Sequence, residues 1–228
     1  MDFMTILQQL GDGMVKTIGI FAWTLVLSLP LGLLVSFGRM SKNRVVAWIF
    51  RIYISVMRGT PLMLQLLVVY FGPYYISLFV SEHFPSMAFR VNISGGYRFI
   101  AIIVGFVLNY AAYFAEIYRS GIESMPAGQY EAAKILGYSK TQTFMKIILP
   151  QVIKRILPSV TNEVITLVKD TSLAFSLAYM EMFTIAKQIA AAQTTMMPFV
   201  VAAVFYYVFN LVVASVMEHI EKRLAYYR

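Results

Sequence analysis

Charged side chains within a long apolar stretch are the residues of this sequence best suited to bind a ligand. Residues 156–180 are long and apolar enough to cross a membrane, yet they contain Glu163, Lys169 and Asp170. Ionisable groups at membrane depth are costly and by default mark a pathway or a binding site. This stretch is therefore the first candidate for chemistry.

The polar side chains of this stretch share one face when it is drawn as a helix. With successive residues about 100° apart, they fall within a sector of about 120°. They are Ser159, Asn162, Glu163, Thr166, Lys169 and Asp170, and we call these six residues the polar stripe. Because the rest of the circumference is apolar, the polar stripe is expected to face a wet cavity or a partner helix.

The charges of the polar stripe favour a cationic ligand. Glu163, Lys169 and Asp170 sum to −1, which leaves one carboxylate without a partner on this helix. Two alternatives stay open: Lys169 and Asp170 merely satisfy one another or cap the helix, and Glu163 is protonated or pairs with Arg58. Either state of Glu163 would remove the basis for a cation preference.

The composition shows which kind of protein must position these residues. The chain has 228 residues, of which 59% are hydrophobic and 13% are charged, whereas about a quarter of a soluble domain is charged. An ordinary soluble domain is therefore excluded. The absence of cysteine excludes a disulfide framework and a thiolate metal site. His83 and His219 lie too far apart to indicate a metal site.

Five stretches have the length of a membrane-spanning helix, which needs about 20 apolar residues. They lie at about 14–38, 61–80, 99–118, 156–180 and 198–217. The third contains Glu116, which we expect to pair with Arg119. The fourth would be placed only weakly by hydropathy. We predict an all-α membrane protein with five transmembrane helices in a single domain, residues 1–228.

The basic residues predict the orientation of these helices. Segment 39–60 holds five Lys and Arg, segment 119–158 holds six, and the C-terminal end holds Lys222, Arg223 and Arg228. The opposite side holds four. Positive charge is retained in the cytoplasm, so we expect the N-terminus outside and the C-terminus cytoplasmic in a multi-pass protein of the cytoplasmic (inner) membrane. The basic excess is then topological, and no nucleic-acid partner is expected.

The arginines of segment 44–58 recur every seven residues, beside apolar residues at helical spacing. This pattern predicts an amphipathic helix on the cytoplasmic leaflet, with its arginines reaching toward phosphate. An ordinary amphipathic connector fits it equally well.

The most specific pattern lies in the long basic segment. Glu131-Ala132-Ala133 is followed after three residues by Gly137, and after nine more by Ile147, one residue and Leu149-Pro150. We expect a short helix over 130–136, a turn at Gly137 and a second helix that runs until Pro150. The two would form a rigid knob, which the small Ala132 and Ala133 let another surface approach closely.

This pattern resembles the permease subunits of binding-protein-dependent ABC importers, whose E-A-A-x3-G-x9-I-x-L-P loop docks into the ATPase subunit. The sequence is similar to the polar amino acid branch, because it also carries Arg58-Gly59-Thr60-Pro61 and Val168-Lys169-Asp170-Thr171-Ser172-Leu173. The resemblance implies that residues 126–150 are a cytoplasmic coupling loop with Glu131, Ala132, Ala133 and Gly137 at its centre.

The resemblance also implies the partners. They are a dimer of ABC ATPase subunits, a second permease copy that is identical or related, an extracytoplasmic substrate-binding protein and membrane lipid. The sequence has no G-x-x-x-x-G-K-[ST] phosphate loop, so we expect ATP and Mg to be bound by the ATPase. This chain is then expected to be a transport subunit without a cofactor of its own, and not an enzyme.

We expect the transported solute to be a basic amino acid, meaning arginine, lysine or histidine, whose charge pairs with Glu163. The substrate-binding residues predicted on this basis are Glu163, Asn162, Thr166, Asp170, Ser159 and Asn109. Alternatives are a neutral polar amino acid such as glutamine, a secondary cation-coupled transporter or channel, and a purely structural membrane protein. The last two give no reason for the loop from Glu131 to Pro150.

Overall fold

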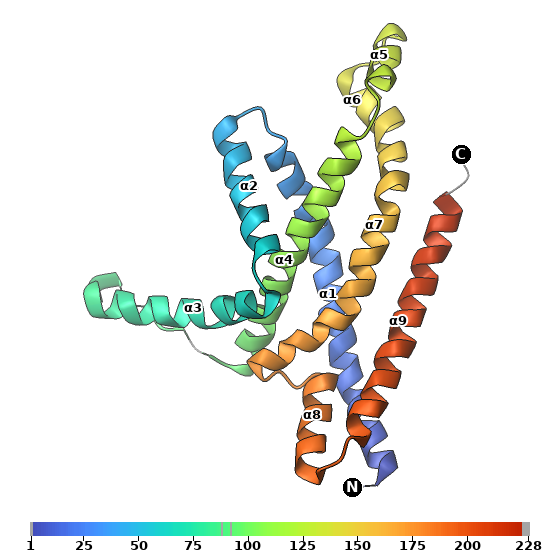
Figure 1. Ribbon diagram of the computed structural model, residues 1–228. Coiled ribbons are helices and arrows are strands. Elements are labelled where there is room, and N and C mark those ends of the chain that lie inside the picture. The colour runs from blue at the N-terminus through green and yellow to red at the C-terminus, as the bar shows by residue number, and fades with distance from the viewer. Residues whose placement is uncertain (1, 88, 92, 225–228) are drawn as a thin grey trace.

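The computed structural model describes residues 2–87, 89–91 and 93–224, so the predicted cytoplasmic residue Arg228 lies outside the described residues. Within that part the chain is helical and contains no strand (Figure 1). The α-helices are α1 (Phe3–Arg39), α2 (Arg44–Gly59), α3 (Leu62–His83), α4 (Gly95–Glu123), α5 (Ala127–Ile135), α6 (Lys140–Thr143), α7 (Leu149–Asp170), α8 (Met182–Gln193) and α9 (Met197–Leu224).

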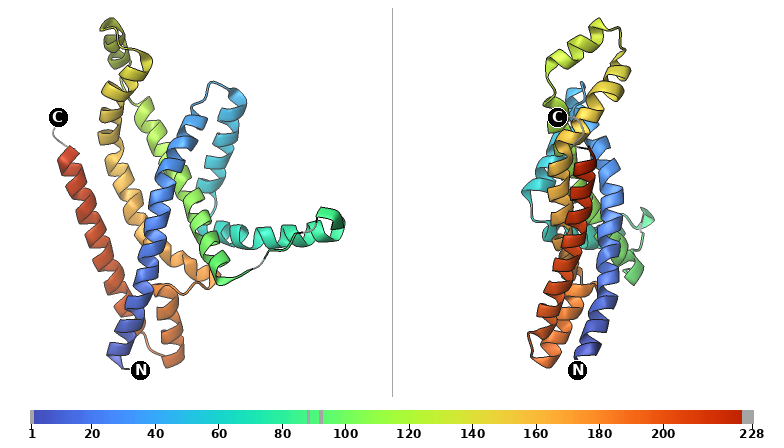
Figure 2. Two further views of the ribbon diagram at one scale, coloured as in Figure 1. Left: turned by 180° about the vertical axis from the view of Figure 1, so that it is seen from behind. Right: turned by 90° about the vertical axis from the view of Figure 1, so that its right-hand side faces the viewer.

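Four helices of the described residues are long and apolar enough to cross a membrane. They are α1, α3, α4 and α9. They contain the predicted spans 14–38, 99–118 and 198–217 and, apart from Pro61, the span 61–80. Three of them, α1, α4 and α9, run along the long dimension of the molecule together with α7, whereas α3 projects sideways from this bundle (Figures 1 and 2). The crosswise direction of α3 was not expected.

The predicted span 156–180 is not one continuous helix. The α-helix α7 ends at Asp170, and the chain continues as a 3₁₀-helix, Thr171–Leu177. The hydroxyls of Thr171 and Ser172 donate to the carbonyls of Val168 and Lys169, at 2.7 and 2.8 Å. Such local bonds compete with the regular α-helical pattern, which hydropathy does not register. The short helix α8 then precedes α9.

Close contact between α1 and α4 forms the centre of the bundle. The buried face of α1 carries small residues, including Thr24, Ser28 and Gly32. A Cβ atom placed on Gly32 would lie 2.8 Å from the Cβ atom of Phe114 in α4. Small residues let helix backbones approach in this way within membranes, and this contact positions α4 for the rest of the fold.

Helix α2 packs against α1 and α4 through one buried residue. Its Ile54 lies against Val35 of α1 and against Ala112 and Ala115 of α4. Most of its apolar side chains, including Trp48, stay exposed, so the placement of segment 44–58 on the cytoplasmic leaflet stays a prediction. The packing brings Arg58 beside the middle of α4, although it was counted with the cytoplasmic basic residues.

The loop 126–150 forms a knob at the end of the bundle where α4 ends and α7 begins (Figure 1). Helix α5 ends as predicted before Gly137, whose φ of +78° is in the left-handed region that favours glycine. The prediction that a second helix ends at Pro150 is wrong. A π-helical turn, Phe144–Ile148, precedes Pro150 and helix α7 continues through it, because the wider turn accommodates a residue without an N–H group.

Replacing Gly32 by alanine should lower the thermal unfolding midpoint of the detergent-purified protein, because the added methyl group collides with Phe114. Overpacking of this kind costs about 1 to 3 kcal/mol. Gly19→Ala is the matched control on the same helix, since no atom lies within 4 Å of the Cβ position there. Equal midpoints for the two variants would contradict the tight α1–α4 contact.

Candidate functional site

The polar stripe lies along α7 on the face turned away from the bundle core. Ser159, Asn162 and Lys169 are exposed, and Glu163, Thr166 and Asp170 are half-buried. On the opposite face Val164, Leu167 and Val168 belong to the main hydrophobic core. The predicted separation of the two faces is confirmed, and it is the apolar face that packs.

Asp170 is held by a neighbouring helix and not by the adjacent lysine. The hydroxyl of Tyr110 in α4 donates to Oδ2 of Asp170 at 2.8 Å. Among the described residues, no ion pair joins Lys169 to Asp170. The alternative in which these two residues satisfy one another therefore differs from the structure.

Glu163 is the carboxylate of the polar stripe that lacks a partner. Within residues 2–87, 89–91 and 93–224 it makes neither an ion pair nor a hydrogen bond, and Arg58 is not within ion-pair distance. Its strongest electrostatic neighbours are Arg58 and Asp170. Glu163 is thus half-buried and has no ionic partner within the described part of the chain. By contrast Glu116 pairs with Arg119 as predicted.

Asn109 lies in an anchoring network where α2 meets α3, half-way along α4. Its side chain is buried, and Nδ2 donates to the carbonyl of Met57 at 3.0 Å and to Oε1 of Gln65 at 2.9 Å. Gln65 in turn donates to the carbonyls of Met57 and Thr60, at 2.9 and 3.0 Å. Substrate contact by Asn109 stays a prediction. In the structure its amide stabilises the turn between α2 and α3.

The knob presents an apolar tip that sequence reasoning missed. Glu131 and Ala132 are exposed, whereas Ala133 is buried within the knob and so supports its packing. Beside Gly137, Ile135 is 86% exposed and Leu136 is 73% exposed. Two large apolar residues just before a helix-ending glycine are the signal that could have identified them.

A second missed residue is Glu181, which is fully buried where α8 begins. Its carboxylate accepts from the backbone N–H groups of Phe183 and Thr184, at 2.8 and 2.6 Å. It also accepts from the hydroxyl of Tyr206 in α9 at 3.3 Å, and Thr17 of α1 lies 3.5 Å away. Glu181 thus ties α8 to two long helices. Glu181 is the N-cap residue of α8, although glutamate is not among the residues that usually mark this position.

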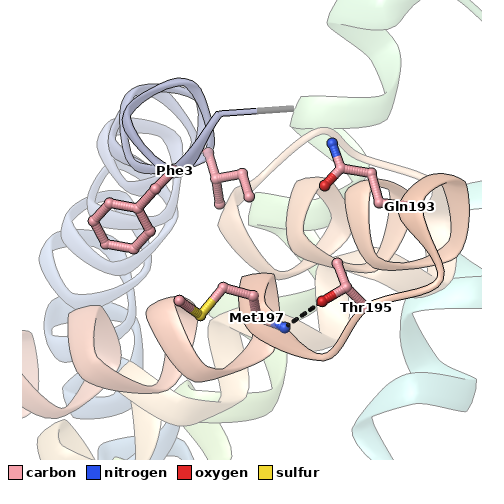
Figure 3. A pocket seen from close by; sticks show the side chains of 5 residues that line it. Phe3, Gln193, Thr195 and Met197 are labelled. Atoms are coloured by element: carbon pink, nitrogen blue, oxygen red, sulfur yellow. Dashed lines mark hydrogen bonds between the residues drawn. The ribbon is translucent and has the colours of Figure 1, made fainter.

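A separate hollow lies at the opposite end of the molecule from the knob, between the start of α1 and the turn that joins α8 to α9 (Figure 3). It is lined by Phe3, Ile6, Gln193, Thr195 and Met197. This lining offers no charged side chain to a zwitterion, so the polar stripe remains the better candidate for binding a charged solute.

Residues 28–226 match the family described as binding-protein-dependent transport system inner membrane component. The chain is 33% identical over 220 residues to the L-cystine transport system permease protein TcyB of Bacillus subtilis (strain 168), covering 96% of this chain and 87% of the relative.

Two further comparisons agree with this match. The chain is 34% identical over 213 residues to the histidine/lysine/arginine/ornithine transport system permease protein HisM of Escherichia coli (strain K12), covering 90% and 86% of the two chains. A crystal structure of an amino acid ABC transporter with histidines superposes with a TM-score of 0.80 at 27% identity, covering 98% of this chain and 99% of that chain. As a permease subunit of an amino acid ABC transporter, the chain is a transport component rather than an enzyme. It therefore belongs to the family of inner membrane components of binding-protein-dependent transport systems.

Proposed function

We propose that this permease subunit serves an ATP-driven importer of basic amino acids, with the polar stripe of α7 as its substrate site. The observation that carries the proposal is the unpaired, half-buried carboxylate of Glu163. An arginine, lysine or histidine side chain in its charged form would supply the missing partner. The similarity to HisM, which is named for basic substrates, supports the same class.

A second permease copy completes the site. Polar and charged groups at membrane depth face a protein interior or water and not hydrocarbon. In this chain Ser159, Asn162 and Lys169 are exposed on one side of α7, so another protein surface must enclose the path. An identical or related permease copy supplies that surface.

The remaining partners attach at the two ends of the bundle. The knob, with Glu131, Ala132, Ala133 and Gly137 beside its apolar tip, docks into an ABC ATPase dimer that binds ATP and Mg. A substrate-binding protein delivers the solute at the opposite end. We place the N-terminus outside the cell membrane and the C-terminus in the cytoplasm, with α7, the 3₁₀-helix and α8 together completing the fifth crossing.

A neutral amino acid such as glutamine is the second candidate. Glu163 forms no ion pair with another described residue, so it could equally bind the α-ammonium group of a neutral zwitterion. The similarity to TcyB, which is named for L-cystine, favours this alternative. A secondary transporter remains the weaker candidate, because it would have no ATPase for the knob to bind.

Replacing Glu163 by glutamine should lower arginine uptake by about 10-fold or more, since a hydrogen bond to a charged group contributes about 1.5 to 3 kcal/mol. The assay uses liposomes that contain this chain, its ATPase and its binding protein, with lysine, histidine and glutamine as competitors. Glu218→Gln is the control, because that carboxylate is exposed and pairs with Lys222 on α9. Unchanged uptake and selectivity in Glu163→Gln would show that Glu163 is scaffold and that the binding protein alone selects the substrate.

Replacing Leu136 by serine should reduce co-purification of the co-expressed ATPase several-fold, because the tip loses apolar surface that docking would bury. Met196→Ser is matched in exposure, 71% against 73%, and lies at the other end of the chain's bundle, so the ATPase should be retained. Gly137→Val should also weaken docking, since valine at a φ of +78° is strained. Full retention of the ATPase by both knob variants would refute the docking assignment.

A further inference from the structure

An exposed cationic side chain, that of Arg58, lies beside the middle of α4. Arg58 lies in the last turn of α2, its side chain is exposed, and none of the ion pairs formed by the described residues includes it. The corner that follows it is bonded to Asn109, half-way along α4. A charged residue beside the middle of a membrane-spanning helix is by default a candidate for a functional site.

Arg58 lies next to the polar stripe. Its guanidinium carbon is 5.2 Å from the centre of the Tyr113 ring, and that ring centre is 6.3 Å from the ring of Tyr110. The Tyr110 hydroxyl donates to Asp170. Arg58 is also near enough to two carboxylates, Glu163 and Glu116, for its charge to act on both, and Glu116 is already paired with Arg119. Arg58 and Asp170 therefore each contact one ring of the Tyr110–Tyr113 pair.

The backbone around Arg58 is fixed on both sides. The carbonyl of Met57, the preceding residue, accepts from both Asn109 and Gln65, and the carbonyl of Thr60 accepts from Gln65. Gln65 also donates to the hydroxyl of Thr60 at 2.7 Å. This network holds the last turn of α2 in place, so Asn109 and Gln65 act as positioning residues for Arg58.

We propose that Arg58 binds the α-carboxylate of the substrate, while Glu163 and Asp170 take its cationic groups. This inference rests on the proposed function and extends it to a second subsite. Every free amino acid carries a carboxylate, and a guanidinium binds carboxylates through two parallel hydrogen bonds. The ring of Tyr113 keeps the guanidinium oriented when no substrate is present. The site would then select for a free α-carboxylate whatever the side chain.

The test measures direct binding of labelled arginine to the purified complex of permease and ATPase. The binding protein is left out because it has its own selectivity. The competitor is agmatine, which is arginine without its carboxylate. Wild type should prefer arginine by about tenfold or more, which corresponds to one charge-assisted interaction. In Arg58→Met, arginine affinity should fall to that of agmatine while agmatine affinity stays constant. Arg58→Lys should restore part of the preference.

Lys187→Met is the matched control, because Lys187 is an exposed cation that also lies over an aromatic ring, that of Phe175, and is outside the polar stripe. The proposal would be overturned if Arg58→Met kept the preference for arginine over agmatine. It would also be overturned if the control variant lost that preference and Arg58→Met did not. Assembly with the ATPase and the unfolding midpoint show that each variant is folded.

The two proposals fail in different ways. If wild type binds glutamine and not arginine, the basic substrate class is wrong, and the comparison is made between glutamine and 4-aminobutanamide, its decarboxylated form. Loss of that preference in Arg58→Met would still support the carboxylate subsite. A preference that persists would refute it.

Discussion

Polar atoms inside a membrane bundle must find their partners within the protein, and this constraint orders the middle of the molecule. Asn109 and Gln65 satisfy each other and the carbonyls where α2 turns into α3. Tyr110 satisfies Asp170, and Glu181 is satisfied by donors from α8 and α9. In contrast, Glu163 and Arg58 form no ion pair with any residue that the structure describes. A few buried atoms of the described chain, such as Oγ1 of Thr24 and Oδ1 of Asn210, also have no hydrogen-bond partner.

Local sequence patterns predicted most helices well, because apolar length and helix-ending residues depend only on neighbouring residues. Apolar length identified α1, α4 and α9, and Gly137 marked the end of α5. The placement of α2 and the sideways course of α3 depend on contacts with distant segments, which hydropathy does not contain. The end of α7 at Asp170 depends on hydroxyls that bond to the backbone, so a window average over 156–180 could not show it.

The candidate site was partly predictable for the same reason. Helical periodicity alone grouped Glu163 with the other members of the polar stripe, and the structure confirms that they share a face. Their partners are on other helices, so Tyr110 as the donor to Asp170 could not be predicted. Arg58 was grouped by its seven-residue spacing with surface arginines, and only the packing of α2 against α4 brings it beside the middle of α4.

The length of α7 has a mechanical consequence. From the π-helical turn next to the knob to Asp170, the chain is one α-helix of 22 residues with Pro158 in its interior, about 33 Å long at about 1.5 Å per residue. When the helix moves as a rigid body, a tilt of about 10° about one end moves the other end by about 6 Å, roughly one helical turn. A small rotation at the wide turn before Pro150 is thus enlarged along α7, and bending at Pro158 would set how much of it reaches the far end.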